Sequence, residues 1–336
     1  MKKLMQGNEA VVEGSLKAGL KFYAAYPITP ASEIMHVMAT KKGVAFVHAE
    51  DEISAVNMAV GASIAGGKAM TSTAGPGFSL MQETIGLAAI TETPVVIVDV
   101  QRVGPGTGMP TLPAQGDVLQ SAYGRHGDTY PIVLCPNSVE ECYKYTIEAF
   151  NAAEEILGPV ILLSDGFVGH LYETVDLESI KYDIKNRNTE PFGKGVRHFT
   201  GLVSKNWVPQ TKSAEAYKEW LRRVKKRTEE VSKRYAFYEY AENKKADTLL
   251  IAYGITSRVL LPLKDKYSIF RPIRMYPVLE EELKKIASKY KRVIVVEMND
   301  GQYQKEVERV LKREVELIPV LGGSISLEGI RKEWKL

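Results

Sequence analysis

Short apolar runs alternate with helical patterns along the first half of the chain. The apolar runs predict strands at 21–26, 44–48, 69–73, 95–100, 131–135 and 159–164. Apolar positions at helical spacing predict helices at 8–19, 31–41, 52–65, 78–90, 116–124 and 138–156, the first capped by Asn8. Short apolar strands separated by helices pair in parallel, with helices on both faces of the sheet. We therefore expect an α/β fold with a doubly wound parallel sheet.

This alternation breaks in the middle of the chain and then returns. Residues 166–210 lack periodicity and contain several glycines and prolines, which predicts an extended segment. Residues 213–242 have the spacing of one amphipathic, highly charged helix. Alternation resumes with predicted strands at 247–254, 270–277 and 291–300. The expected divisions of the chain are residues 1–185, 186–245 and 246–336.

The composition is that of a soluble globular protein of two or three domains. The chain has 336 residues, of which 45% are hydrophobic and 25% charged, and its net charge is +3. It lacks a basic run interleaved with aromatic residues and a long apolar segment, so we expect neither a nucleic-acid partner nor a membrane span. No signal peptide is recognisable, which predicts a cytoplasmic protein. Two cysteines are too few for an iron–sulfur cluster or a structural zinc site.

The first candidate for chemistry is the segment YPITP, residues 26–30, which follows an apolar strand. Its two prolines fix φ at their own positions and favour extended conformations at Tyr26 and Thr29. Thr29 is thus a hydroxyl on a stiff turn at a strand end, where open α/β sheets bind ligands. The alternative is that Thr29 caps the helix that begins near Ala31.

The second candidate is a run of three carboxylates, Glu50, Asp51 and Glu52, before an alanine-rich helix. Acidic residues favour the positive end of the helix dipole, which explains Glu50 and Asp51. Glu52 begins a helix that is otherwise almost entirely apolar. Its carboxylate is therefore predicted to point into a poorly solvated place and to exchange a proton with a ligand there.

Two glycine-rich loops follow further predicted strands. Gly75 and Gly77 lie where a strand gives way to a helix, so backbone amides there are candidates to receive an anion, with tight helix packing as the alternative. Neither loop fits a Walker loop or a dinucleotide fingerprint. Arg102 precedes the second loop and offers a forked donor for a small carboxylate, with a surface salt bridge as the alternative.

Five strings occur in order along the chain and together resemble one protein family. They are YPITP, HAEDEISAVNMAVGASIAGGKAMTSTAGPGFSLMQE, VDVQRVGPGTGMPTLPAQGDV, HGD and VVEMNDGQ. Over nearly its whole length the chain is similar to the alpha subunit of the 2-oxoacid:ferredoxin oxidoreductases, which use thiamine diphosphate, and the third string is most similar to the 2-oxoglutarate branch. The resemblance implies a pyrimidine-binding domain of a thiamine diphosphate fold at 1–185, a linker at 186–245 and a smaller transketolase C-terminal-like domain at 246–336.

The resemblance also implies roles for particular residues. Glu52 is the expected catalytic residue, and it hydrogen-bonds the aminopyrimidine ring of the cofactor. Thr29 and Arg102 are expected to bind the carbonyl and carboxylate of a 2-oxoacid. Additional cofactor contacts are expected from Tyr26, Pro27, Gly75 and Gly77. For a distal substrate carboxylate the candidates are Arg125 and His126, or a cation of a partner chain.

The resemblance places several parts of the enzyme on other chains. Ser164-Asp165-Gly166 resembles only half of the metal–diphosphate motif of thiamine enzymes, so we expect this chain to bind no metal. Mg²⁺ and [4Fe–4S] clusters are expected on partner chains, namely a beta subunit and gamma and ferredoxin-like delta subunits. The expected reaction is oxidative decarboxylation of a 2-oxoacid with coenzyme A to acyl-CoA, carbon dioxide and reduced ferredoxin, and it is expected to run in either direction. The alternatives are pyruvate or a branched-chain 2-oxoacid as substrate, a self-sufficient enzyme of transketolase type, and a non-catalytic scaffold subunit.

Overall fold

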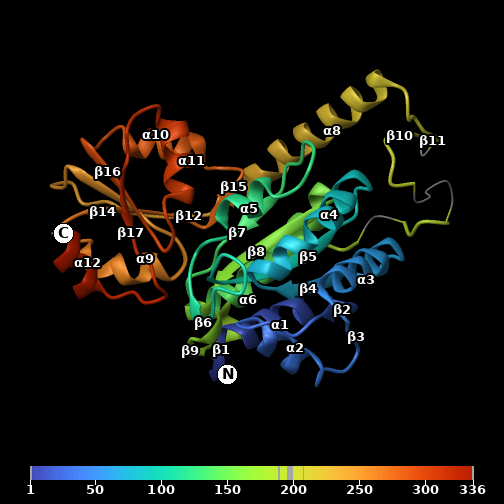
Figure 1. Cartoon of the computed structure of the whole chain (residues 1–336), viewed down its shortest axis with the longest axis horizontal. Helices are drawn as coiled ribbons and strands as arrows, with labels where there is room; N and C mark the ends of the chain where they lie inside the picture. Colours follow the sequence, from blue (N-terminus) through green and yellow to red (C-terminus); the bar gives the residue numbers. More distant parts are fainter. Residues whose placement is uncertain (1, 188–189, 195–199, 207, 335–336) are drawn as a thin grey trace.

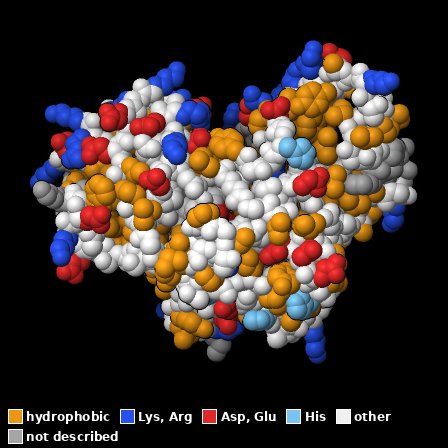
Figure 2. All heavy atoms as spheres, viewed as in Figure 1, with side chains coloured by type: hydrophobic (Ala, Val, Ile, Leu, Met, Phe, Trp, Pro, Cys, Tyr) orange, Lys and Arg blue, Asp and Glu red, His pale blue; other side chains and the backbone are white. Residues whose placement is uncertain are grey.

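The computed structural model describes residues 2–187, 190–194, 200–206 and 208–334. Two main sheets and their helices form two lobes, with the N-terminal part of the chain in one and the C-terminal part in the other (Figure 1). In the space-filling view a groove separates the lobes at the top of the molecule (Figure 2). None of the helices in these ranges has the length and apolar character needed to span a bilayer.

The larger sheet has eight strands. They are β2 (Phe22–Ala25), β3 (Ala45–His48), β4 (Ala69–Thr73), β5 (Val95–Val103), β6 (Met109–Pro113), β7 (Ile132–Leu134), β8 (Pro159–Asp165) and β15 (Arg274–Tyr276). Their order is β15-β7-β8-β5-β4-β2-β3, with β6 paired to β5. All neighbours pair in parallel except β15 with β7 and β6 with β5. The predicted doubly wound parallel sheet is therefore confirmed, with two antiparallel additions.

Helices cover both faces of this sheet, as predicted. They are α1 (Gly7–Lys17), α2 (Ser32–Met38), α3 (Glu52–Ile64), α4 (Gly75–Ile90), α5 (Val118–Tyr123), α6 (Val139–Ile156) and α7 (Gly166–His170). One face packs against α3, α4 and α5 through buried side chains such as Val56 and Phe78. The other face packs against α1, α2 and α6, for example through Val11 and Phe150. Burial on both faces explains why the strands are almost entirely apolar.

The smaller sheet forms the second lobe. Its strands are β12 (Tyr238–Ala241), β13 (Thr248–Ile251), β14 (Ser268–Pro272), β16 (Arg292–Glu297) and β17 (Glu316–Pro319), in the order β12-β14-β13-β16-β17. Its helices are α9 (Gly254–Leu260), α10 (Glu280–Ala287), α11 (Gln302–Leu311) and α12 (Leu327–Trp334). The core on one face of this sheet is continuous with the α3–α4–α5 side of the larger sheet. The two lobes therefore share a hydrophobic core.

Several short elements lie outside the two main sheets. An antiparallel pair joins β1 (Lys3–Gln6) to β9 (Tyr172–Val175), and a small hairpin of β10 (Ser204–Lys205) and β11 (Val208–Pro209) precedes α8 (Ala214–Ser232). The predicted linker also includes residues 188–189, 195–199 and 207, which lie outside the described residues. In Figure 1, α8 runs along the upper edge of the first lobe, from the hairpin toward the second lobe.

Two predicted elements are wrong in their extent. The helix predicted at 213–242 ends at Ser232, and residues 238–241 instead form β12, because an aromatic run suits the edge of a sheet. The single strand predicted at 270–277 divides at Ile273, so that β14 belongs to the smaller sheet and β15 to the larger one. The segment 268–276 therefore contributes a strand to each sheet and connects the two lobes.

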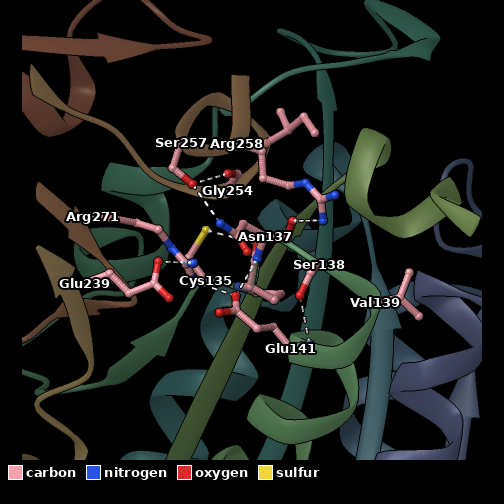
Figure 3. A network of polar contacts seen from close by, with 12 residues as sticks. Cys135, Asn137, Ser138, Val139, Glu141, Glu239, Gly254, Ser257, Arg258 and Arg271 are labelled. Atoms are coloured by element: carbon pink, nitrogen blue, oxygen red, sulfur yellow. Dashed lines mark hydrogen bonds and ion pairs between the residues drawn. The ribbon is translucent and has the colours of Figure 1, made fainter. Parts of the chain in front are cut away.

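Polar contacts reinforce this junction at the turn between β7 and α6. Asn137 donates to Ser257 Oγ at 3.0 Å, and its carbonyl oxygen accepts a hydrogen bond from Arg258 at 3.1 Å. Glu141, in the first turn of α6, pairs with Arg271 of β14. Figure 3 shows these side chains converging from both lobes. The position of the second lobe relative to the first is thus fixed by hydrogen bonds and an ion pair as well as by apolar packing.

A second polar junction is centred on Gln115, which follows β6 and is fully buried. Its side-chain amide donates to the carbonyl oxygen of Tyr253 at 2.9 Å. Its side-chain oxygen accepts hydrogen bonds from Thr256 Oγ1 at 2.9 Å and from the Met298 backbone amide at 3.1 Å. Since the second lobe supplies all of these partners, it fixes the turn that leads into α5.

Arg187 anchors the segment after the first lobe to the sheet. Its guanidinium pairs with Glu154 of α6 at 2.6 Å and donates to the backbone oxygens of Ser63 and Gly67 at 2.9 and 2.8 Å. The Glu154 side chain is only 4% exposed. A buried carboxylate that loses its partner is strongly destabilising.

We therefore expect Arg187→Ala to lower the free energy of unfolding of the isolated chain by about 3–5 kcal/mol. Urea unfolding followed by circular dichroism measures this change. Arg292→Ala is the matched control, because Arg292 pairs with Glu316 on the surface, where removal costs under about 1 kcal/mol. Equal effects of the two substitutions would contradict the anchoring role of Arg187.

Candidate active site

Several loops meet at the carboxyl edge of the larger sheet. Thr29 lies in the loop after β2, α4 begins at Gly75 just after β4, and Arg102 lies near the end of β5. Helix α3 begins at Glu52 soon after β3. From β2 the chain moves outward to β3, whereas β4 and β5 lie on the other side of β2, so the winding direction reverses between β2 and β4. Open α/β sheets bind ligands at such a reversal, outside the carboxyl ends of the strands.

Thr29 lies on an exposed loop that two side chains hold from below. Arg102 Nη1 donates to the carbonyl oxygen of Thr29 at 2.8 Å, and Asn8 Nδ2 donates to that of Pro30 at 2.9 Å. Asn8 thus fixes this loop, and its predicted role as a helix cap is wrong because the N-cap of α1 is Gln6.

The hydroxyl of Thr29 is not used as a helix cap. Helix α2 begins at Ser32, and its N-cap, Ala31, is not bonded by any side chain, so the capping alternative for Thr29 is wrong. In the described ranges no hydrogen bond engages Thr29 Oγ1. Tyr26 is 40% exposed and Pro27 is half-buried. The side chains of Tyr26 and Thr29 are therefore accessible at the carboxyl end of β2.

Arg102 is buried at the end of β5, with 7% of its surface exposed. Its Nη1 is engaged by Thr29, and its Nε is buried with no partner. Among the residues that the structure describes it forms no ion pair, so the surface salt-bridge alternative is wrong. A guanidinium with donors left over beside a hydroxyl-bearing loop is suited to bind a small carboxylate.

Glu52 is buried at the start of α3. Asp51 caps this helix by accepting a hydrogen bond from the Ser54 amide at 2.6 Å, and Glu50 is exposed, as the helix-dipole interpretation predicts. Glu52 is 7% exposed, and nowhere in the described ranges does its carboxylate accept a hydrogen bond. A largely buried carboxylate that accepts no hydrogen bond within the chain is available to accept one from a ligand.

Gly77, in the first turn of α4, lies directly against Glu52. A Cβ atom on Gly77 would lie 2.6 Å from Glu52 Oε1 and 2.2 Å from Thr73 Oγ1, closer than any real contact. Thr73 Oγ1 is itself buried without a partner. Only glycine lets the N-terminus of α4 approach this carboxylate, so Gly77 determines the shape of the site.

Two acids that sequence reasoning missed lie beside Gly75. Asp99 of β5 is fully buried, and Asp117 lies at the N-cap of α5, with its Oδ2 3.9 Å from the position of a Cβ on Gly75. Burial, together with the neighbouring Asp117 carboxyl, raises the pKa of Asp99 well above its usual range. Burial raises the pKa of Asp117 to about 6, against the opposing effects of Asp99 and Arg102. The sequence does contain a signal for Asp99, because an acidic residue inside an otherwise apolar strand is unusual.

The raised pKa of Asp99 predicts a pH-dependent stability. The folded chain must take up a proton that the unfolded chain releases above about pH 4, so stability falls as pH rises from there toward the folded pKa. Asparagine needs no proton. In urea unfolding, Asp99→Asn is expected to gain at least about 1 kcal/mol over the natural chain between pH 5 and pH 8. Asp265→Asn, in an exposed turn, is the control, and parallel pH profiles for Asp99→Asn and the natural chain would contradict the assignment.

Arg125 and His126 do not reach this edge. Arg125 is buried, and it donates to the backbone oxygens of Ser121 and Ala122 at the end of α5 and to Gln82 at 3.3 Å. His126 is exposed and lies 3.5 Å from the position of a Cβ on Gly86, in the middle of α4. Arg125 therefore serves as a helix cap, and neither residue is brought together with Thr29, Glu52 and Arg102.

Asp165 holds elements together through both of its oxygens. Its Oδ1 accepts a hydrogen bond from the Val168 amide at 2.9 Å, and its Oδ2 accepts one from the Ile255 amide of the second lobe at 2.9 Å. In the described part of the chain no group of three or more His, Cys, Asp or Glu side chains is arranged to hold a metal ion. Asp165 thus acts as a strand terminus, as its sequence context indicates.

Comparison with known proteins decides the family. The profile described as pyruvate flavodoxin/ferredoxin oxidoreductase, thiamine diphosphate-binding, matches residues 13–236. The chain belongs to this family. A 2-oxoglutarate synthase subunit KorA of Archaeoglobus fulgidus is 43% identical, over 96% of this chain and 95% of the relative. A ketoisovalerate oxidoreductase subunit VorB of Methanothermobacter marburgensis is 35% identical, over 96% of this chain and 94% of the relative.

Solved structures place the family's fold on both lobes. The 2-oxoglutarate:ferredoxin oxidoreductase from Magnetococcus marinus, solved with 2-oxoglutarate, coenzyme A and succinyl-CoA bound, superposes with a TM-score of 0.91 at 32% identity. The match covers 99% of this chain and 65% of that chain. A split-gene transketolase, at 13% identity and a TM-score of 0.55, shares the fold over 98% of this chain. The predicted thiamine diphosphate fold is thereby confirmed.

The residues at the sheet edge fit the cofactor of this family. An aminopyrimidine ring requires a buried carboxylate with a free lone pair, and Glu52 has one in the described structure. The carboxylate lies where a side chain at residue 77 would otherwise be, so Gly77 is needed for its position. Glu52 is therefore the residue of this edge that would hold the aminopyrimidine ring.

Proposed function

We propose that the chain is the alpha subunit of a thiamine diphosphate-dependent 2-oxoacid:ferredoxin oxidoreductase that acts on 2-oxoglutarate. The reaction is oxidative decarboxylation with coenzyme A to succinyl-CoA, carbon dioxide and reduced ferredoxin, and it is open to operation in reverse. The observation that carries the proposal is the placement of two contacts at one edge of the sheet, in a chain of this family: buried Glu52 lies against Gly77, and Arg102 is bonded to Thr29. When bound, thiamine diphosphate supplies the carbanion chemistry.

Glu52 is the catalytic residue in this proposal. Its carboxylate accepts a hydrogen bond from the aminopyrimidine ring and holds the ring's proton at that nitrogen. Burial strengthens this bond because little water competes for the carboxylate. The first turn of α4 closes over it at Gly77, and Gly75, Tyr26 and Pro27 are the further residues that we assign to cofactor contacts.

Thr29 and Arg102 bind the reacting end of the substrate. The remaining donors of the guanidinium pair with the 1-carboxylate, and the Thr29 hydroxyl donates to it or to the adjacent carbonyl oxygen. Because Arg102 also holds the backbone of Thr29, the two groups are fixed as one unit. A substrate bound by this unit would present its 2-oxo carbon to the cofactor in one fixed orientation.

The choice of 2-oxoglutarate rests on the relatives. Relatives named as 2-oxoglutarate synthase subunits are 43% and 40% identical, compared with 35% for a ketoisovalerate oxidoreductase subunit. Pyruvate and branched-chain 2-oxoacids remain the alternatives. Since Arg125 is used as a helix cap, we propose that a partner chain supplies the cation for the distal carboxylate, with His126 as the candidate on this chain.

The site needs partner subunits to be complete. Exposed apolar side chains lie on α3 and α4, the helices that begin at Glu52 and Gly75, namely Ile53, Met58 and Leu80. Exposed apolar side chains that gather beside a site mark a protein interface. We propose that a beta subunit covers these side chains and supplies Mg²⁺, the diphosphate contacts and a [4Fe–4S] cluster. Gamma and delta subunits and ferredoxin then complete the electron path. We place the complex in the cytoplasm.

Dye reduction by the co-purified complex tests this function. The chain and its partner subunits are assayed for coenzyme A-dependent reduction of a viologen dye with 2-oxoglutarate, pyruvate and 2-oxoisovalerate. We expect 2-oxoglutarate to give the highest kcat/KM. Preference for another 2-oxoacid would keep the mechanism and overturn the substrate. No activity with any of them, with cofactor and clusters shown to be bound, would indicate a scaffold subunit.

A further inference from the structure

The acid pair Asp99–Asp117 lies under the N-terminus of α4 and has no part in the chemistry described above. Both oxygens of Asp99 and the Oδ2 of Asp117 are buried without a hydrogen-bond partner among the described residues, and the Gly75 backbone amide is the group that favours their charged forms. The backbone amide of Asp117 is engaged by Gln101 Oε1 at 3.0 Å. Two facing carboxylates in this setting cannot both stay charged without a large penalty.

A single proton between the two acids resolves this geometry. It supplies the missing donor, so that one carboxyl group bonds the other, and it leaves one negative charge on the pair. Asp99 is the more deeply buried member and is therefore the protonated one at neutral pH. At neutral pH the pair therefore carries a single negative charge.

The groups that face the pair indicate where its charge acts. From β5 these are Gln101 and the guanidinium of Arg102, and from α4 the Gly75 backbone amide favours the charged form of both acids. Arg102 is the only cation among these groups, and its charge favours the ionised form of Asp117. Arg102 has no ion pair in the described structure, so Asp117, whose ionised form its charge favours, is the candidate for its counter-charge.

We propose that Asp99 and Asp117 are positioning residues that share one proton, and that their single negative charge keeps Arg102 in place to receive the 2-oxoacid carboxylate. The role that this inference gives to Arg102 rests on the proposed function. The shared proton is independent of that function. The charge count of the pair, and not the identity of either acid, then governs substrate binding.

Two variants of the assembled complex separate charge from structure. Asp99→Asn mimics the protonated acid and leaves the charge on Asp117, whereas Asp99→Asn with Asp117→Asn keeps the shapes and removes the charge. We expect Asp99→Asn to keep the KM for 2-oxoglutarate within about twofold, and the double variant to raise it about tenfold with a much smaller change in kcat. Asp99→Asn should unfold at or above the natural melting temperature, because it removes the acid that has to be protonated and buries no additional charge.

The pH profile of KM adds a readout that a structural role would not move. As pH falls from 7.5 to 5.5, Asp117 gains a proton through its pKa of about 6, so the KM of the natural enzyme should rise toward that of the double variant. The substrate's own titration is common to both proteins and cancels in the comparison. Equal KM values for the single and double variants, or an effect on kcat alone, would overturn the proposal.

Infrared spectroscopy of the isolated chain tests the shared proton without any activity. At pH 7 the natural chain should show the absorption of a buried protonated carboxyl group, and Asp99→Asn should lack it. Absence of that band from the natural chain would overturn the proposal, whatever the enzyme does. If the band is present and the natural complex has no activity with 2-oxoacids, the proposed function fails and the role assigned to Arg102 fails with it.

Discussion

Replacing Glu52 by glutamine is expected to reduce kcat of the assembled enzyme about 10²- to 10⁴-fold. Glutamine fills the same volume beside Gly77 but removes the negative charge that favours the protonated ring nitrogen of the cofactor. The substrate contacts that we propose at Thr29 and Arg102 are untouched, so KM should change little. Steady-state dye reduction with 2-oxoglutarate measures both constants.

Glu50→Gln is the matched control for this substitution. It makes the same chemical change two residues earlier, at an exposed carboxylate whose contact is a 3.2 Å hydrogen bond from Ser54 Oγ. Its kcat should stay close to that of the natural enzyme. If both variants behave alike, or if Glu52→Gln retains full activity, Glu52 is not the catalytic residue.

Arg102→Met is expected to lower kcat/KM about 10²- to 10³-fold, mostly through KM. Methionine keeps the apolar stem but loses the donors that face the 1-carboxylate and the bond that holds Thr29. Initial rates over a range of 2-oxoglutarate concentrations separate the two constants. The effect should be similar with pyruvate, because both substrates have the same 2-oxocarboxylate end.

Two further variants control the Arg102 experiment. Arg102→Lys keeps the positive charge but not the paired donors of the guanidinium, so its kcat/KM should lie between those of Arg102→Met and the natural enzyme. Arg292→Met removes a surface arginine of the second lobe and should leave the kinetics unchanged. A KM unaffected by Arg102→Met would contradict the assignment of this residue to the substrate.

Local pattern was sufficient to predict the centre of the fold. The strands of the larger sheet are short, apolar and separated by helices, so their parallel pairing follows from burial on both faces. The same logic located Glu52, because a carboxylate at the start of an apolar helix has few ways to reach water. The positions of Thr29 and Arg102 at one edge follow from the parallel direction of their strands.

Features that depend on distant pairing could not be read from the sequence. The run at 270–277 looks like one strand, and only the meeting of the lobes divides it between two sheets. Asp99 and Asp117 are far from Gly75 along the chain, and no local pattern brings them together. Gln115, which fixes the turn before Asp117, finds its partners more than a hundred residues away. In each case the partner, not the residue's own neighbourhood, determines the role.

The most direct test of the central claim is hydrogen exchange at C2 of bound thiamine diphosphate. The assembled complex is diluted into deuterium oxide and quenched with acid, and the exchange rate is measured by NMR for the natural enzyme, Glu52→Gln and Glu50→Gln. The account predicts fast exchange in the natural enzyme and in Glu50→Gln, and exchange slowed about 10²-fold or more in Glu52→Gln. Equal rates in all three would show that this chain does not supply the carboxylate that activates the cofactor.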